Sequence, residues 1–354
     1  MKVHVVDPPA YTPPYDHELC AALAAAGVEV ELITGPFRHG EVPEPNGYER
    51  RELFYRQGAT RVARAAAHVP DMLRYRQTAR AADVIHFQWL AIPSLDRHLL
   101  PRGRPLVITA HEILGRDGGA RGRAAQAALL RCFDAVIAHS NDGRNRLISE
   151  AALDPDRVHV IPVGVFAHLA QLPEGPLPPE LPATDRPVVL DFGLIRPYKG
   201  LDVLLEAWQG VQDAELWVIG SPRYDITALQ AGAPPSVHFV TRFVTDLELA
   251  AAFRRADLVV LPYRESEQSG VLATAIAFGK PILTTEVGGF AELGAALQLV
   301  PPGDPAALQA GLTDLLTNEQ ARLKLGASAG ALAHGKLSWA RIARDTRALY
   351  EATS

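Results

Sequence analysis

The chain has 354 residues, of which 48% are hydrophobic and 21% charged, and its formal net charge is −5 at pH 7. This length exceeds what one hydrophobic core usually supports, so we expect two domains, and the acidic balance does not favour a nucleic-acid partner. The cysteines, Cys20 and Cys132, provide neither a disulfide framework nor a zinc site, which indicates a reducing compartment.

The first half of the chain alternates short apolar runs with helical patterns. Strands are expected at Val3–Val6, Val28–Thr34, Val84–Phe87, Leu106–His111, Ala135–Ser140 and Val158–Val163. Helices are expected at His17–Ala26, Gly122–Cys132 and Asp142–Glu150. Apolar strands with little polar alternation, separated by helices, predict a parallel sheet that is covered on both faces.

The first of these runs also bears on location. Val3–Val6 has the pattern of a strand and not of a signal peptide. No apolar run reaches the roughly 18 residues that are needed to cross a bilayer. We therefore expect a cytoplasmic protein, with peripheral contact at the inner membrane face left open.

That membrane option depends on residues 50–80. The segment holds eight arginines and two acidic residues, with Phe54, Leu73 and Tyr75 interleaved. The arginine-rich composition of the whole chain favours a solvated helical face. The alternative is a basic helix pair that rests on anionic lipid.

The second half follows a break at residues 171–187, which carry six prolines and predict an interdomain linker. The strand and helix alternation then resumes. Strands are expected at Val188–Phe192, Glu215–Gly220, Val237–Val240, Leu258–Pro262, Pro281–Thr285 and Leu297–Val300, and a last helix at Trp339–Ala352. These elements predict a second doubly wound domain, with ligands at the C-terminal strand ends.

Two segments of this second domain have the pattern of phosphate-binding turns. In the first, strand Val188–Phe192 ends at Gly193, and a short basic loop with Arg196 and Lys199 leads into a helix at Leu201–Trp208. In the second, Ser269-Gly270 opens a helix that ends at Gly279. A strand end, a glycine and a helix N-terminus together present free N–H groups and a positive dipole end to an anion. Two such sites in one domain suggest a diphosphate ligand.

These segments resemble the donor-binding half of retaining GT-B glycosyltransferases of family 4, which use nucleotide-sugars. The matching stretches are Phe192-Gly193…Lys199-Gly200-Leu201-Asp202, Val237–Asp246, Ala256–Tyr263, Phe278–Glu292 and, more weakly, Val300–Asp304. The resemblance implies an α/β protein with the GT-B fold, in which two Rossmann-like doubly wound domains face a central cleft. Residues 1–170 would bind the acceptor, residues 188–337 would bind the donor, and a crossover helix at 338–354 would return to the first domain.

The resemblance also assigns the donor site. Lys199 would hold the donor diphosphate, together with Gly193 and Arg196, and stabilise the charge on the leaving nucleotide. Arg196 stands two residues after the usual position, which Leu194 occupies. The alternatives are a lysine in the first turn of a surface helix and a solvated loop arginine. Arg242 and Phe243 would face the base.

The paired glutamates of the family are absent. Their two positions fall on Ser266 and Thr274, and Glu265 and Glu267 flank the first. The run Gln268-Ser269-Gly270-Val271 resembles a variant branch with a Gln-Ser-Gly turn at this place, which would put the Ser269 and Gly270 backbone at the phosphate. Glu267 is preferred over Glu265 near the sugar, and a solvated acidic loop is the alternative.

The acceptor side is assigned from the first domain. His111 follows a strand, and the family often has a histidine there beside the donor sugar; a histidine that satisfies a backbone carbonyl is the competing interpretation. Glu112, Tyr11, Tyr15 and Asp16 are candidate acceptor contacts. The first loop carries prolines where many relatives have glycines.

We therefore expect a hexosyltransferase that moves a sugar from a nucleoside-diphosphate sugar to an acceptor hydroxyl with retention. The catalytic residues would be His111, Lys199 and Glu267, with neither a metal nor a cofactor, and UDP is preferred over GDP. The acceptor is left open among small molecules, glycans and lipid-linked groups. The alternatives are a sugar-nucleotide 2-epimerase of the same architecture and a catalytically degenerate nucleotide-sugar-binding partner.

Overall fold

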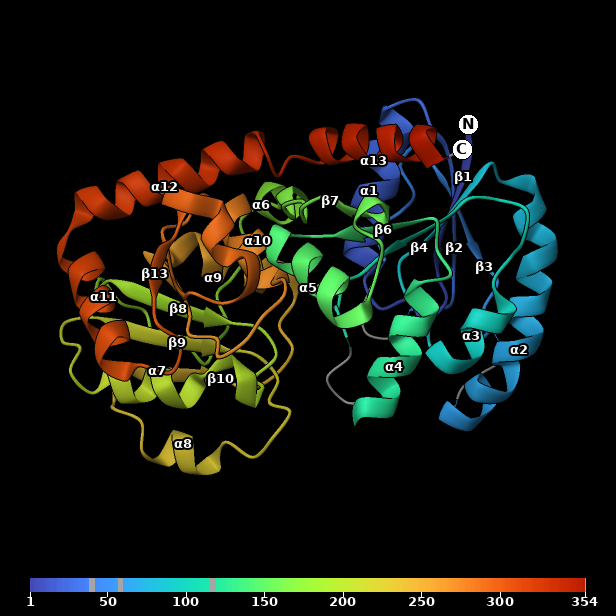
Figure 1. The fold of residues 1–354 in the computed structure, drawn as a ribbon. Coiled ribbons are helices and arrows are strands. Elements are labelled where there is room, and N and C mark those ends of the chain that lie inside the picture. The colour runs from blue at the N-terminus through green and yellow to red at the C-terminus, as the bar shows by residue number, and fades with distance from the viewer. Residues whose placement is uncertain (38–41, 57–59, 115–118, 354) are drawn as a thin grey trace. The chain divides into compact units, whose positions relative to one another are not determined.

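The computed structural model describes residues 1–37, 42–56, 60–114 and 119–353. The chain divides into two compact units, each drawn as a ribbon in Figure 1. Unit 1 comprises Met1–Gly164 and Leu337–Ser354, and unit 2 comprises Val165–Lys336. Both are parallel α/β units of the Rossmann-like kind, which is the predicted fold class.

Unit 1 is built on a sheet of the order β3-β2-β1-β4-β5-β6-β7, in which all paired strands are parallel. Its strands are β1 (Lys2–Asp7), β2 (Glu29–Thr34), β3 (Glu49–Glu52), β4 (Val84–Phe87), β5 (Leu106–Thr109), β6 (Ala135–Ala138) and β7 (Val158–Val160). Its helices are α1 (Pro13–Ala25), α2 (Arg61–Thr78), η1 (Ala79–Ala81), α3 (Pro93–Leu99), α4 (Gly119–Leu130), α5 (Asn141–Ala151), η3 (Pro155–Arg157) and α13 (Trp339–Thr353).

Unit 2 repeats the same winding, with the strand order β10-β9-β8-β11-β12-β13. Its strands are β8 (Val188–Phe192), β9 (Glu215–Ile219), β10 (Val237–Val240), β11 (Leu258–Leu261), β12 (Ile282–Thr285) and β13 (Gln298–Val300). Its helices are α6 (Ala167–Gln171), η4 (Pro197–Lys199), α7 (Leu201–Trp208), α8 (Thr227–Ala231), α9 (Asp246–Arg255), α10 (Gly270–Ala277), η5 (Gly288–Ala296), α11 (Pro305–Thr317) and α12 (Glu319–His334).

The central strands are buried along their whole length because they carry almost only apolar side chains. Every residue of β4 and of β11 is buried, and one face of each sheet packs into a hydrophobic core. Strands with both faces covered need no polar alternation, which is why the sequence shows none. In each sheet the strand order reverses at one point, between β1 and β4 in unit 1 and between β8 and β11 in unit 2. Ligands of such sheets bind at the carboxyl ends of the strands at these switch points.

The last helix is part of unit 1, although it follows unit 2 in the sequence. Helix α13 packs against α1 (Figure 1) and buries Trp339, Ile342 and Tyr350. The Trp339 ring lies so close to Gly164 that a methyl group there would be 2.3 Å from it. The packing of α13 thus requires glycine at position 164.

Three sequence predictions need correction. Strand β3, with the sequence ERRE, was not predicted, because an edge strand of charged residues has no apolar signal. Residues 50–80 form this strand, the single helix α2 and η1, and not a helix pair; residues 57–59 lie outside the described part. The segment 171–187 is no free linker, since it lies within unit 2.

Three arginines anchor that proline-rich segment. Arg254 of α9 donates to the carbonyls of Ala170, Leu172 and Pro173. Arg255 donates to those of Thr184 and Arg186, and Arg242 pairs with Glu180. Backbone carbonyls that cannot enter a sheet thereby find donors.

Candidate functional site

The predicted phosphate-binding turn of unit 2 brings a lysine over a glycine. Gly193 follows β8 with φ of 107°, a conformation that favours glycine. A methyl group at this position would lie 2.8 Å from Nζ of Lys199 and 2.9 Å from Val271 of α10. Three of the predicted donor residues, Gly193, Lys199 and Val271, therefore meet at the carboxyl ends of β8 and β11.

A second glycine fixes the lysine loop. Gly200 has a φ of 72°, and a methyl group there would lie 2.0 Å from the carbonyl oxygen of Pro262. The one-turn helix η4 therefore ends at Gly200 and α7 begins directly after it. Lys199 is held at the junction of these two helices.

The lysine ammonium lies in a mostly buried environment. Burial lowers the pKa of Lys199, and the Coulomb attraction of Asp191 opposes this effect. Burial raises the pKa of Asp191 on β8 to about 7, while Lys199 lowers it. Nζ of Lys199 also lies 5.1 Å from the ring centroid of Tyr263, within the range of a cation–π contact. A desolvated cation attracts a bound anion more strongly than a cation in water does, so this lysine is suited to bind an anionic ligand.

The second predicted turn opens α10 beside the same lysine. Ser269 is the N-cap, and its hydroxyl accepts from the N–H of Leu272 at 3.2 Å. The hydroxyl of Tyr263 lies 3.2 Å from the same Ser269 oxygen. Gly270 is exposed, and the first turn of α10 holds no acidic residue. This helix end thus presents its positive dipole without an internal carboxylate.

The altered carboxylate motif is now placed. Ser266 is buried and donates to the carbonyl of Gln268 at 2.9 Å, and Thr274 is buried and donates to that of Gly270 at 2.8 Å. Glu265 is exposed, and Glu267 is partly buried. The two positions where the family has glutamates therefore serve the loop backbone.

The loop is also held close to the glycine turn after β12. A methyl group at Gly288 would lie 2.1 Å from the carbonyl oxygen of Ser266 and 3.5 Å from Cα of Glu267. Glu267 is thereby fixed through its backbone at this turn.

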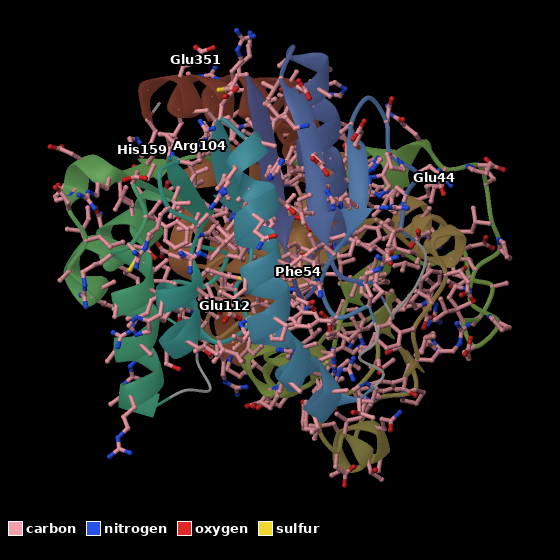
Figure 2. All side chains as sticks on the ribbon, turned by 90° about the vertical axis from the view of Figure 1, so that its right-hand side faces the viewer. Glu44, Phe54, Arg104, Glu112, His159 and Glu351 are labelled. Carbon is pink, nitrogen blue, oxygen red and sulfur yellow. The ribbon has the colours of Figure 1, made fainter. Side chains whose placement is uncertain are left out.

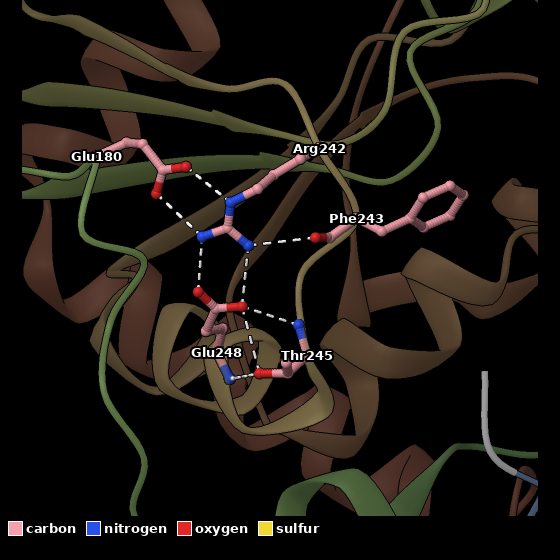
Figure 3. Close-up of polar contacts among 5 residues, drawn as sticks. All are labelled: Glu180, Arg242, Phe243, Thr245 and Glu248. Atoms are coloured by element: carbon pink, nitrogen blue, oxygen red, sulfur yellow. Dashed lines mark hydrogen bonds and ion pairs between the residues drawn. The ribbon is translucent and has the colours of Figure 1, made fainter. Parts of the chain in front are cut away.

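The two residues predicted at the base, Arg242 and Phe243, differ in their surroundings. Arg242 donates to both oxygens of Glu180 and of Glu248, and to the carbonyl of Phe243 (Figure 3). Because these contacts occupy the guanidinium, only the backbone of Arg242 is left for the predicted contact with the base. Phe243 is 62% exposed, and the guanidinium of Arg223 lies 5.5 Å from its ring. Arg196 is exposed at the start of η4.

The corresponding edge of unit 1 holds a buried histidine network. Nε2 of His111 lies 2.9 Å from the amide oxygen of Gln88, and its Nδ1 lies 3.3 Å from Nε2 of His139. The Nδ1–H of His139 donates to the carbonyl of Ile161 at 3.0 Å. His86 is completely buried between Tyr350 and Thr109.

These histidines are neutral near pH 7. Burial lowers the pKa of His139 to about 4 and that of His86 to about 3. Burial and the neighbouring His139 lower the pKa of His111 well below its ordinary value. His111 can therefore act as a neutral hydrogen-bonding group, and not as a cation.

Two of the acceptor-side candidates line a cavity of about 380 Å³ in unit 1. It lies beyond the carboxyl ends of β4 and β5, next to α3 and α4. Tyr11 and Glu112 line it, as does His111. The remaining wall is mainly apolar, with Trp89, Leu90, Pro93, Leu129 and Leu130. Trp89 stacks on His111 at a centroid distance of 5.0 Å, and Tyr11 meets Trp89 edge-on at 5.4 Å.

The other two candidates are buried and line no part of this cavity. Tyr15 packs against His111, His139 and Trp339. Asp16 contacts Asp7 at the end of β1, and burial raises the pKa of both carboxyls. In this structure Tyr15 and Asp16 support the edge of the sheet and are not offered to a ligand.

Sequence reasoning missed several residues of these two edges. An aspartate within the apolar strand Val188–Phe192 could have revealed Asp191, and a histidine directly after strand Ala135–Ala138 could have revealed His139. Trp89 and Tyr263 carried no such signal. In the described parts of the chain, no three His, Cys, Asp or Glu side chains are grouped so as to hold a metal ion. Nor is any helix there long and apolar enough to cross a membrane.

Comparison with protein families matches both halves of the chain. Residues 186–318 match the family model described as glycosyl transferases group 1, and residues 15–167 match glycosyltransferase family 4. The first match includes the carboxyl edge of unit 2 described above, and the second includes that of unit 1.

Individual relatives are similar over different lengths. A phosphatidyl-myo-inositol mannosyltransferase of Mycobacterium leprae is 35% identical over 44% of this chain and 43% of its own length. A D-inositol 3-phosphate glycosyltransferase of Pseudarthrobacter chlorophenolicus is 29% identical over 96% of this chain and 89% of its own length. For several relatives, including the first, the chain spans less than two thirds of the relative's length.

A solved structure extends the likeness to the whole fold. The Anabaena protein HepE, in complex with UDP-glucose, superposes with a TM-score of 0.74 at 18% identity over 99% of this chain and 100% of that one. At this sequence identity the likeness shows a shared fold and nothing more.

Proposed function

From the match of both units to glycosyltransferase family models and from the GT-B fold, we propose that the chain is a glycosyltransferase that moves a hexosyl group from a nucleoside-diphosphate sugar to an acceptor hydroxyl with retention of configuration. The observation that carries the proposal is the placement of Lys199 over Gly193, beside the N-terminus of α10. A single buried ammonium, open glycine backbone and a helix dipole together match a diphosphate.

The proposed reaction needs the lysine where charge develops. The bond between the sugar carbon and the diphosphate oxygen breaks, and the bond to the acceptor oxygen forms on the same face of the sugar. Lys199 stabilises the negative charge that grows on the departing diphosphate, and the N–H groups at Ser269 and Gly270 assist. In this proposal these groups take the place of a metal ion, and no cofactor takes part.

His111 and Glu267 complete the proposed catalytic set. A neutral His111 would bond to a sugar hydroxyl once Gln88 or His139 gives up its contact with the ring. Glu267 would approach the sugar from its position beside the Gly288 turn. In this proposal both roles are positional.

We propose UDP as the donor nucleotide. HepE, which shares the fold, was solved with UDP-glucose. The exposed Phe243 ring, with Arg223 beside it, provides a surface on which a base could stack, and the backbone of Arg242 would complete the contact.

The acceptor is proposed to carry an apolar part. The cavity of unit 1 is lined mostly by apolar side chains, with Glu112 and His111 among its polar residues. An acceptor would place its apolar portion against Trp89, Leu129 and Leu130 and its hydroxyl towards these polar residues. Small amphipathic molecules and lipid-linked acceptors fit this description better than an unsubstituted glycan.

The test is turnover with a panel of UDP-, GDP-, ADP- and TDP-sugars, measured as release of the nucleoside diphosphate with and without candidate acceptors. We expect release from UDP-sugars that rises when an amphipathic acceptor is added, a product with the anomeric configuration of the donor, and no effect of EDTA. A 2-epimerised sugar formed without acceptor would instead identify an epimerase. Tight nucleotide binding without turnover on any donor would identify a degenerate binding partner.

A further inference from the structure

A second cavity of unit 1 lies away from the proposed active edge. It has a volume of about 430 Å³ and is lined by the end of α2, by η1 and by the loop before β5. Four of its lining side chains are arginines, Arg76, Arg80, Arg102 and Arg104. We call this cavity the arginine pocket.

The arginine pocket is at the amino-terminal edge of the sheet. Arg80 precedes β4 and Arg104 precedes β5, whereas Glu112 follows β5. Figure 2 shows Arg104 and Glu112 towards opposite ends of unit 1. Because parallel strands start at one edge and end at the other, the arginine pocket and the cavity beside His111 open at opposite edges.

No carboxylate neutralises the four guanidinium groups. Among the described residues, none of them forms an ion pair, and the only hydrogen bond of their side chains runs from Arg104 to the carbonyl oxygen of Arg80, at 2.9 Å. The acidic residue nearest in sequence, Asp83, accepts the backbone N–H of Lys2 at 2.8 Å.

Several other arginines of unit 1 have acidic partners, although not all of them do. Ion pairs join Arg74 to Asp71, Arg146 to Glu150 and Arg347 to Glu351. A chain with a net charge of −5 has acidic residues to spare, yet it places none in the arginine pocket. Four like charges around one cavity repel one another, and a bound anion would relieve that repulsion.

We propose that the arginine pocket binds a phosphate group. The guanidinium fork matches phosphate oxygens in pairs, and several forks around a cavity can share a dianion. Leu73, which is 46% exposed, supplies an apolar rim beside the charges. Both an anionic lipid headgroup and a soluble phosphorylated molecule offer this chemistry, and the experiment below separates them.

The test compares two double variants of the full chain. Arg80→Gln/Arg102→Gln removes two charges from the arginine pocket and keeps the Arg80 carbonyl that Arg104 binds. Arg64→Gln/Arg344→Gln removes two exposed charges elsewhere, one of them on the same helix α2. Binding of inorganic pyrophosphate is measured by calorimetry in chains that also carry Lys199→Ala, so that the proposed donor site does not contribute, and binding of vesicles is measured by sedimentation. The vesicles consist of phosphatidylcholine alone or of equal parts phosphatidylcholine and phosphatidylglycerol.

We expect the pocket variant to weaken binding by about tenfold or more, because charge-assisted hydrogen bonds are lost, while the control variant binds as the unmodified chain does. Loss of pyrophosphate binding identifies a soluble phosphate ligand, and loss confined to anionic vesicles identifies a lipid headgroup. Equal binding by the pocket variant and the unmodified chain, or equal weakening in both variants, would overturn the proposal. Melting curves identify any variant that has lost its fold.

Discussion

The carboxyl edges of the two units solve the same problem in opposite ways. In unit 2 the edge is built on glycines: Gly193, Gly200 and Gly288 have positive φ angles, and one partly buried lysine supplies the charge. In unit 1 the edge is filled with side chains, among them His111 and Trp89, whose rings stack on each other. The first arrangement is suited to a diphosphate, which every donor shares. The second is suited to selecting one acceptor by shape.

The largest expected effect comes from a substitution in the glycine-rich edge of unit 2. Gly193→Ala would place a methyl group 2.8 Å from Nζ of Lys199 and displace the lysine. We expect kcat/KM to fall by about a hundredfold, the usual consequence of moving a catalytic group by about 1 Å. The matched control is Gly330→Ala in α12, where a methyl group meets nothing within 4 Å. Unchanged turnover in Gly193→Ala would show that the lysine position does not matter.

The next largest effect is expected from a substitution in the cavity of unit 1. Trp89→Ala deletes apolar surface from the cavity beside His111. We expect KM for an amphipathic acceptor to rise by about tenfold, from roughly 1.5–3 kcal/mol of lost burial, with donor affinity unchanged. Val62→Ala, at an exposed position of α2, is the control. A loss of donor affinity in Trp89→Ala would contradict the division of roles between the units.

The two edges should also respond to pH with opposite signs. Asp191 has a pKa of about 7 in the folded chain and an ordinary value of 3.8, so the stability it contributes is present below pH 3.8 and is lost as the pH rises to about 7. Relative to Asp191→Asn, the unmodified chain should therefore lose up to about 1.4 kcal/mol per pH unit across that range.

His86 has the reverse behaviour. Its ordinary pKa of 6.5 falls to about 3 on burial, so the unfolded chain takes up a proton first as the pH falls below 6.5. Relative to His86→Gln, the unmodified chain should lose stability on acidification. Thermal unfolding of both variants between about pH 4 and pH 8 gives the slopes. Slopes of the same sign would mean that one of these two groups is not buried as described.

The smallest effects separate two neighbours on unit 2. Phe243→Ala should weaken nucleotide binding through about 1–3 kcal/mol of lost stacking and leave the melting temperature unchanged. Arg242→Ala should lower the melting temperature only slightly, because its ion pairs with Glu180 and Glu248 are partly exposed and screened by solvent, and leave nucleotide affinity nearly unchanged. If Arg242→Ala weakens binding more than Phe243→Ala does, the guanidinium touches the base.

What the sequence could predict follows the same contrast. The strands of unit 2 and the turns at Gly193 and Ser269 were predictable, because glycine positions and apolar runs are local signals. The cavity of unit 1 was not, because it is made by side chains from β4, β5 and α4 that meet only in the fold. Strand β3 carries only charged residues and forms because β2 offers it an edge.

Side-chain partners were likewise beyond a single sequence. Nothing local distinguishes Arg242, which two carboxylates hold, from Arg196, which is exposed. Tyr15 and Asp16 were expected in the first loop, but they lie in the first turn of α1, which begins at Pro13 and turns both side chains inward, against His111 and Asp7.

The central claim is that Lys199 binds the donor diphosphate. Its most direct test is calorimetric titration of UDP into the unmodified chain, Lys199→Ala and the exposed control Lys324→Ala. Loss of a desolvated charge-assisted contact predicts that Lys199→Ala weakens binding by about tenfold or more, while Lys324→Ala binds as the unmodified chain does. Equal affinity in all three would contradict the claim and place the diphosphate elsewhere on the edge of unit 2.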